Sequence, residues 1–292
     1  MITPVQEQPP VLVLGATGGQ GGAVAAALLR EGRPVRALVR DETSAAARRL
    51  GTAGAQLAAG DFTDREALTR AMRGAAAAFA LTTPFEAGAD DEIRQGKAII
   101  DAAAAAGLPH LVFSSVAGAA DQTGIPHFES KAEVERALTA SGLPHTVVAP
   151  TYFYDNALGG TGELLSGVFE LPLPAAHPLQ QLGRADLGAF AALVLREPSS
   201  FAGQRIELAS DAPTPQQMSQ AISAALGRPV TFREVPMSTV RHGSPDMAAM
   251  WEFLQGRGYH ADPGALRRDY PSVDWSSFTA WAQETFRDGA LV

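Results

Sequence analysis

The chain has 292 residues, of which 46% are hydrophobic and 18% charged, and its formal net charge is -8. This length and composition predict a globular protein, with either one large domain or a core and a smaller lobe. The negative charge disfavours nucleic-acid binding as a main activity. The absence of cysteine excludes disulfides and thiolate nucleophiles, and the six histidines lack metal-like spacing, so we expect no metal.

Nothing in the sequence indicates export or membrane insertion. Residues 1–10 lack the basic start and apolar run of a signal peptide. No apolar stretch approaches the length of a membrane span. We therefore expect a cytoplasmic protein with no membrane partner, and the sequence leaves open whether it is a monomer or a homodimer.

An apolar run at residues 11–14 leads into a glycine-rich turn, and an alanine-rich helix is expected over residues 19–31. This order of strand, turn and helix is typical of dinucleotide-binding folds. Gly15 permits a sharp turn, Gly18 leaves room for a phosphate, and Gly21 lets the helix pack close to the strand. The helix N-terminus offers free N–H groups and a positive dipole end to a pyrophosphate. The alternative is a plain glycine-rich turn.

Strands and helices alternate through the first half of the chain. Such spacing predicts an α/β fold with a Rossmann-type, doubly wound parallel sheet and right-handed crossovers. We expect further strands at residues 35–39, 55–59, 75–81, 111–113 and 146–149, and helices at residues 44–50, from Thr63 or Asp64, at 90–106 and at 128–141.

The regular pattern ends after Pro150. Residues 151–181 are rich in glycine, proline and aromatic residues and are expected to form a loop over the carboxyl edge of the sheet. We expect residues 1–156 to form the NAD(P)-binding Rossmann domain and residues 157–292 a smaller α/β substrate or partner lobe, with parts of residues 184–235 returning to the core. Strands are expected at residues 205–208 and 230–235, and helices at 186–195, 214–226, 238–257 and 275–287.

Several segments resemble the NmrA-like branch of the atypical short-chain dehydrogenases/reductases. They are residues 15–21 (GATGGQG), 35–40, 60–64, 127–131 (HFESK) and the proline–aromatic–Asn segment 150–156. The resemblance covers the first half densely and the last third loosely, and it implies an NAD(P)-binding Rossmann fold. The family contains NAD(P)H-dependent quinone and enone reductases. It also contains non-catalytic dinucleotide-binding proteins that act as redox sensors or transcriptional co-regulators, so activity carries over less well than fold.

The residue after the second strand decides between the two dinucleotides. An acidic residue there binds the ribose diol, whereas an arginine pairs with the 2′-phosphate. Arg40 occupies this place and favours NADP(H), although NAD(H) stays open because Asp41 follows and is an alternative ribose contact. Arg36 is expected on the other face or in solvent. The alternative for Arg40 is an ordinary solvated side chain.

The resemblance also implies contacts along the carboxyl edge. Asp61 and Phe62 are expected at the adenine, with a helix-capping role as the alternative for Asp61. Thr82 and Thr83 are expected near the nicotinamide ribose, or are simply β-branched residues that end a strand. The expected cofactor-binding residues are Gly15, Thr17, Gly18, Gly19, Gln20, Gly21, Arg40, Asp61, Phe62, Thr82, Thr83, Lys131, Pro150, Tyr152 and Phe153.

In typical short-chain dehydrogenases a Ser, a Tyr and a Lys work together, and the lysine lowers the pKa of the tyrosine. The resemblance implies that Lys131 holds the nicotinamide ribose and that Ser114, or the adjacent Ser115, takes the place of the serine. His127 stands where the tyrosine would be, and is either a proton donor or a helix-start residue without that role. Tyr152 is a candidate for the missing phenol, as is Tyr154, or both line an apolar substrate wall. The candidate catalytic residues are Lys131, His127, Ser114 and Tyr152.

Two functions of different class follow. The first is an NADP(H)-dependent reductase that gives hydride to a quinone- or enone-like small molecule, whose reduction needs less proton donation during hydride transfer than that of a simple ketone. The second is a non-catalytic NADP(H)-binding sensor or transcriptional co-regulator with an aromatic partner surface, although the same residues are more simply a packed core. These residues are Trp251, Phe253, Tyr259, Trp275, Phe278 and Trp281.

Overall fold

The computed structural model describes residues 8–287. These residues form two compact units, each assembled from three segments of chain. The first unit contains the residues up to Ser115 together with Ser130–Val148 and Leu187–Ile206. The second contains Val116–Glu129, Ala149–Asp186 and the residues from Glu207 onward.

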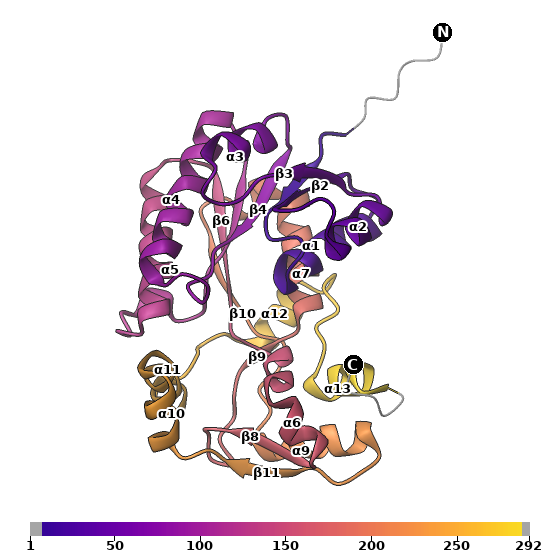
Figure 1. Cartoon of the computed structure of the whole chain (residues 1–292), viewed down its shortest axis with the longest axis vertical. Helices are drawn as coiled ribbons and strands as arrows, with labels where there is room; N and C mark the ends of the chain where they lie inside the picture. The colour runs from indigo at the N-terminus through magenta and orange to yellow at the C-terminus, as the bar shows by residue number, and fades with distance from the viewer. Residues whose placement is uncertain (1–7, 288–292) are drawn as a thin grey trace. The chain divides into compact units, whose positions relative to one another are not determined.

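The main feature of the fold is a seven-stranded sheet with the order β10-β6-β5-β4-β1-β2-β3 (Figure 1). The registers from β6 across to β3 are all parallel. Strand β10 is parallel as well, because Val147 N donates to Gln204 O and Thr151 N donates to Leu208 O, so both strands advance together. The strands are β1 (Val11–Val13), β2 (Val35–Val39), β3 (Gln56–Ala59), β4 (Ala77–Leu81), β5 (Leu111–Ser114), β6 (His145–Pro150) and β10 (Arg205–Leu208).

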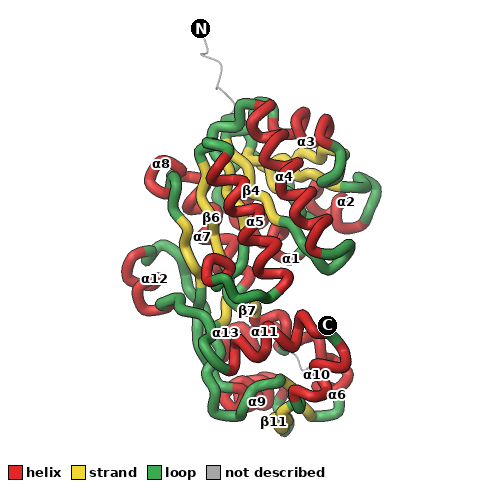
Figure 2. The backbone as a smooth tube through the Cα atoms, turned by 90° about the vertical axis from the view of Figure 1, so that its left-hand side faces the viewer, coloured by secondary structure: helices red, strands yellow, loops and turns green. Residues whose placement is uncertain are grey.

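Helices cover both faces of this sheet. Figures 1 and 2 show α3, α4 and α5 over one face, and α1 and α7 over the other. On the first face, Leu12 and Leu14 pack in one buried cluster with Ile99, Val134 and Leu138. The helices are α1 (Gly19–Arg30), α2 (Ala45–Thr52), α3 (Arg65–Met72), α4 (Ala89–Ala106), α5 (Pro126–Ala140), α7 (Arg184–Arg196) and α8 (Pro198–Phe201). The doubly wound α/β architecture predicted from the sequence is therefore confirmed.

Local signals set the ends of these helices. The Ser44 hydroxyl accepts from Ala47 N and caps α2, while the Asp64 carboxylate, rather than Thr63, caps α3. Gly107 ends α4 in the left-handed conformation with φ 63°. The strand order reverses between β1 and β4, and such a switch point is where open α/β sheets bind ligands.

The second unit contains two small parallel sheets of two strands each. Strand β8 (Val168–Leu171) pairs with β11 (Thr231–Glu234), and β7 (Tyr152–Phe153) pairs with β9 (Gln181–Leu182). The prediction of a loop over residues 151–181 was wrong, because these strands of two to four residues are too short to show a period. The remaining elements are η1 (Ala119–Asp121), η2 (Tyr154–Gly160), α6 (Thr161–Leu165), α9 (Pro215–Leu226), α10 (Met237–Gly243), α11 (Pro245–Gln255), α12 (Pro263–Asp269) and α13 (Phe278–Thr285).

Two helix predictions in this unit need correction. The single helix expected over residues 238–257 is two helices, because Pro245 starts α11 and disfavours helical backbone at Ser244. The Ser244 hydroxyl instead caps α11 by accepting from Met247 N at 3.2 Å. The helix expected from residue 275 starts only at Phe278, where the Ser277 side chain provides the cap.

The aromatic residues near the C-terminus form a packed core. Trp251, Trp275 and Phe278 are buried. Trp251 and Phe278 belong to one buried hydrophobic cluster, and Phe253, Tyr259 and Trp281 are partly buried against it. The interpretation as a core is therefore confirmed, and the partner surface suggested for these residues is wrong. Within residues 8–287, no helix combines the length and hydropathy needed to cross a membrane.

Candidate functional site

The glycine-rich turn after β1 has a conformation that requires glycine at two positions. Gly15 adopts φ +65°, in the left-handed region, and its carbonyl accepts from Gly18 N at 2.9 Å. A Cβ on Gly21 would lie 2.7 Å from Leu14 O and still closer to the backbone of Gly15. Only glycine at this position lets α1 start so close to the end of β1, as the sequence predicted.

The N-terminus of α1 is open to an anion. Gly18 is the N-cap residue, no side chain caps the helix, and its first turn holds no acidic residue. Thr17, Gly18 and Gly19 are exposed. Within 4 Å, and apart from its chain neighbours, a Cβ on Gly18 would meet only Gly15 O among the described residues, at 3.4 Å, so there is room beside this residue. Unpaired amide N–H groups at a helix N-terminus beside glycines fit a pyrophosphate.

Arg40 directly follows β2 and is exposed. Its guanidinium forms an ion pair with Glu86 at 3.4 Å, and the two side chains are 75% and 67% exposed. Asp41 does not turn back toward this arginine, because its Oδ1 accepts from Thr43 N at 2.8 Å and from the Thr43 hydroxyl at 2.6 Å. These bonds hold the pKa of Asp41 below its usual range. Arg40 is thus the group at this strand end that is free to exchange a weak surface partner for a phosphate.

Arg36 has a structural role. Its guanidinium donates to the carbonyl oxygens of Ala71 and Arg73, at 2.6 and 3.0 Å. These carbonyls lie at the end of α3, where helix carbonyls lack intrahelical partners. Arg36 therefore ties β2 to α3 and is not available to a cofactor phosphate.

Asp61 shapes the turn between β3 and α3. Its Oδ1 accepts from Thr63 N, the Thr63 hydroxyl and Asp64 N at 2.7, 2.6 and 3.0 Å. The Thr63 bonds are the main cause that lowers the pKa of Asp61, and the nearby charge of Arg40 contributes. Asp61 is exposed while the neighbouring Phe62 packs against the core. Asp61 therefore forms the turn before α3, the helix-capping role suggested for it is wrong because Asp64 caps α3, and the adenine contact stays a prediction.

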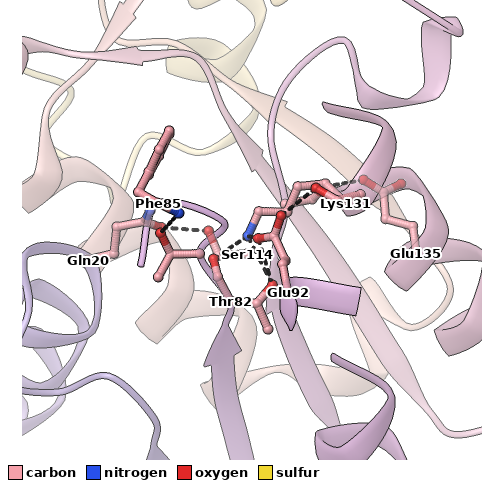
Figure 3. Close-up of polar contacts among 10 residues, drawn as sticks. Gln20, Thr82, Phe85, Glu92, Ser114, Lys131 and Glu135 are labelled. Carbon is pink, nitrogen blue, oxygen red and sulfur yellow. Dashed lines mark hydrogen bonds and ion pairs between the residues drawn. The ribbon is translucent and has the colours of Figure 1, made fainter. Parts of the chain in front are cut away.

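Ser114 links the glycine-rich helix to the centre of the sheet. This serine is buried at the end of β5, and its hydroxyl donates to Gln20 Oε1 at 2.7 Å (Figure 3). The adjacent Ser115 donates to Glu135 instead, and Glu135 accepts from Arg205 at 2.9 Å. The two serines therefore have different partners, and only Ser114 lies next to a residue of the glycine motif.

Lys131 is buried at the carboxyl end of β4. Its Nζ donates to Thr82 O at 2.5 Å and lies 2.9 Å from Glu92 Oε1 (Figure 3). The Thr82 hydroxyl is 3.2 Å from the same Nζ, so Thr82 meets the lysine through two atoms. Burial lowers the pKa of Lys131, and the charge of Glu92 opposes this shift. Thr83 is only partly buried, and its hydroxyl accepts from Phe85 N at 3.4 Å.

Glu92 is a site residue that the sequence analysis missed. It lies in the first turn of α4 and is fully buried. A signal was present, because Glu92 shares the apolar face of its helix with Gly96 and Ile99, at the spacing of neighbouring turns. Among three successive acidic residues at a helix start, that spacing is the feature that distinguishes Glu92.

His127 is buried in the second unit and has an acidic partner. Its Nδ1 lies 2.7 Å from Asp246 Oδ1, and its ring meets Phe128 edge-on with a centroid separation of 4.8 Å. Asp246, in the first turn of α11, was not identified from the sequence. His127 is the second residue of α5, so it is both a helix-start residue and one side of a His–Asp pair.

The aromatic segment after β6 separates into two environments. Tyr152 is partly buried in β7 beside Trp251, with ring centroids 5.4 Å apart, and burial raises its pKa. Phe153 follows it in β7, and the buried Pro150 accepts from Ala117 N at 2.9 Å. Tyr154 is fully buried and donates to Ser276 O at 3.2 Å, so it is a core residue and not a substitute for the missing phenol.

A doubly wound parallel sheet with a glycine turn at its switch point and an uncapped helix behind it defines a dinucleotide-binding Rossmann protein. The chain matches the profile of the NmrA-like family over residues 7–280, and it belongs to that family.

Three proteins show what the chain is similar to. An NAD(P)H azoreductase of Xenophilus azovorans is 30% identical over 81% of both chains. A (4-alkanoyl-5-oxo-2,5-dihydrofuran-3-yl)methyl phosphate reductase of Streptomyces griseus is 33% identical over 79% of both chains. The NADPH-dependent quinone oxidoreductase QOR2 of Escherichia coli, solved with NADPH, is 25% identical with a TM-score of 0.78, covering 95% of this chain and 100% of that one.

Proposed function

We propose that the protein is an NAD(P)H-dependent oxidoreductase that prefers NADP(H) and transfers hydride to a flat, electron-poor small molecule of the quinone or enone class. The observation that carries this proposal is the uncapped N-terminus of α1, which follows the left-handed turn at Gly15 and leaves room beside Gly18. We place the pyrophosphate there. A cytoplasmic location is part of the same proposal.

Three residues or pairs of the first unit have proposed roles toward the cofactor. Arg40 pairs with the 2′-phosphate and gives the preference for NADP(H). Lys131 holds the nicotinamide ribose from the end of β4. The Ser114–Gln20 hydrogen bond fixes the position of α1 relative to β5 beside the ribose. The bound nicotinamide supplies the hydride, and these side chains bind and orient it.

The acceptor class is supported by two independent observations. The usual tyrosine is replaced by His127, so strong proton donation at the moment of hydride transfer is not available from a phenol at that position. The relatives named above reduce an azo compound, a quinone and a ring named as an oxo-dihydrofuran with an alkanoyl group. All three names describe acceptors with a conjugated multiple bond, in which the added electron pair is delocalised. We infer that this chain acts on the same class of acceptor.

The test is a steady-state assay of NADPH oxidation against a matched panel. The panel contains a benzoquinone, a naphthoquinone, an azo dye, a cyclic enone and the corresponding saturated ketone. We expect turnover of conjugated acceptors and little or none of the saturated ketone, whose alkoxide product needs a proton at once. Good turnover of the saturated ketone would contradict the acceptor class. Tight NADPH binding without turnover of any acceptor would instead support the redox-sensor function.

A further inference from the structure

A buried carboxylate lies behind Lys131 and is bound from three sides. Glu92 has no exposed surface, and its Oε1 lies 2.9 Å from Lys131 Nζ and accepts from the Thr82 hydroxyl at 3.0 Å. Its Oε2 accepts from the Ser130 hydroxyl at 2.5 Å. Figure 3 shows Glu92, Lys131 and Thr82 meeting in this way. A buried ion pair costs desolvation energy on both sides and is weak evidence for a purely stabilising role.

We propose that Glu92 is a positioning residue for the cofactor: it keeps Lys131 charged and holds its ammonium at the carboxyl end of β4. The inference rests on the proposed function, because it assumes that Lys131 binds the nicotinamide ribose. Glu92 does not touch the cofactor itself and acts through the lysine.

The charges around Lys131 make Glu92 the decisive neighbour. Burial lowers the pKa of Lys131, and Glu92 counters this both by its charge and by its hydrogen bond. Glu135 on the same helix also favours the charged lysine, but its carboxylate is engaged by Ser115 and Arg205. On its side toward β5, the lysine lies over the Phe113 ring, whose centroid is 5.5 Å from Nζ. Without the charge of Glu92, desolvation would favour the neutral amine.

The geometry also leaves the ammonium one hydrogen for a ligand. An ammonium has three N–H donors. Two of them make the shorter contacts to Thr82 O and to Glu92, at 2.5 and 2.9 Å. The contact to the Thr82 hydroxyl is longer, at 3.2 Å, and that hydroxyl already donates to Glu92. A ribose hydroxyl would take this third, weakly used hydrogen of the lysine.

The composition of the chain makes the test unusually direct. Lysine occurs only at positions 97 and 131, so a protein labelled with ¹³C at lysine Cε gives two side-chain signals. Lys97 is 51% exposed by its side chain and serves as an internal reference. NMR titration follows the two lysine signals in the full-length wild type and in the variants Glu92→Gln, Glu92→Asp and Ser130→Ala. Calorimetry measures the NADPH affinity of each protein at about pH 7 and about pH 9. The 2′-phosphate is ionised at both pH values.

In the wild type we expect the Lys131 signal to report an ammonium at pH 7, with NADPH affinity nearly constant across this range. Glu92→Gln should move the titration midpoint of Lys131 downward while leaving Lys97 unchanged. It should weaken NADPH binding about tenfold at the higher pH, the scale of one charge-assisted hydrogen bond. Glu92→Asp keeps a carboxylate at this position, so it should preserve much of the Lys131 charge and of the NADPH affinity that Glu92→Gln loses. Ser130→Ala removes one hydrogen bond to Glu92 but neither charge of the pair, so it should retain the flat pH profile.

Two results would overturn the proposal. The first is a wild-type Lys131 that is neutral at pH 7, which is measurable even where Glu92→Gln fails to fold. The second is a folded Glu92→Gln variant with unchanged Lys131 titration and unchanged NADPH affinity at both pH values. Failure of the proposed function is recognised separately, because the wild type would then turn over no acceptor of the panel described above.

Discussion

His127 Nδ1 lies 2.7 Å from Asp246 Oδ1, and the histidine is only 8% exposed. A carboxylate at Nδ1 favours the tautomer in which Nδ1 carries the hydrogen and donates it to Asp246. Asp246 thereby fixes the orientation of the ring and stabilises the imidazolium when it forms, as a carboxylate partner does for histidines that transfer protons.

This pair leads to a prediction about proton donation. If His127 donates a proton, His127→Ala should lower kcat on the preferred quinone by about a hundredfold, the lower end of the contribution of general acid–base catalysis. Asp246→Asn removes the carboxylate that orients the ring, so it should also lower kcat while leaving NADPH binding unchanged. His127→Phe is the matched control for shape, and a wild-type kcat in that variant would assign His127 a packing role alone.

Arg40 leads to a prediction about the choice of dinucleotide. We expect NADPH to bind more tightly than NADH, and Arg40→Ala to narrow the gap by about 1–3 kcal/mol, the scale of a charge-assisted hydrogen bond. Glu86→Gln removes the carboxylate that competes for this guanidinium and should tighten NADPH binding a few-fold at most, because the pair is exposed. Calorimetric titration of both cofactors measures the gap. Equal affinity of the wild type for NADPH and NADH would contradict the role of Arg40.

The glycine turn leads to a prediction that separates binding from folding. Gly18→Val places a branched side chain where we expect the pyrophosphate, in a position with φ -98° and room for a Cβ. NADPH binding should be lost while the melting temperature and the circular dichroism spectrum stay close to those of the wild type. Gly21→Val is the contrasting variant, because its Cβ would overlap the Leu14 and Gly15 carbonyl groups and should destabilise the fold itself. Normal NADPH binding by Gly18→Val would refute the phosphate assignment.

The sequence predicted the Rossmann part of the chain well because its signals are local. Strands buried on both faces are continuous apolar runs, and the helices between them end at capping residues such as Asp64 and Gly107. The second unit gave weaker signals, since β7 and β9 have two residues each and acquire their conformation from pairing partners far along the chain. The break at Ser244 was marked by the proline that follows it, but the helical period on both sides concealed it.

The candidate site was predictable residue by residue but not contact by contact. Ser114 and Gln20 were both expected in the site, yet their hydrogen bond joins positions 94 residues apart. Glu92 and Asp246 were missed for the same reason, because each is defined by a partner on a different element. Sequence pattern places a residue on a face of a helix, and only the tertiary fold decides which charge it meets.

A last prediction concerns His110, which is buried beside β6. Its protonation in the unfolded chain should lower the stability of the protein in acid. Its Nε2 lies 2.9 Å from the Thr146 hydroxyl, which itself donates to Phe201 O, so the neutral ring donates to Thr146. Burial, with a contribution from His145, lowers the pKa of His110 to about 4 from the ordinary 6.5. The unfolded chain therefore binds more protons between these values, and the free energy of unfolding should fall by about 3 kcal/mol as pH drops through this window.

Urea unfolding at about pH 7 and about pH 5 should show a larger loss of unfolding free energy for the wild type than for His110→Gln, which keeps an N–H donor but cannot titrate. The exposed His242→Gln variant should behave as the wild type, and an equal loss in the wild type and His110→Gln would mean that another group controls acid stability.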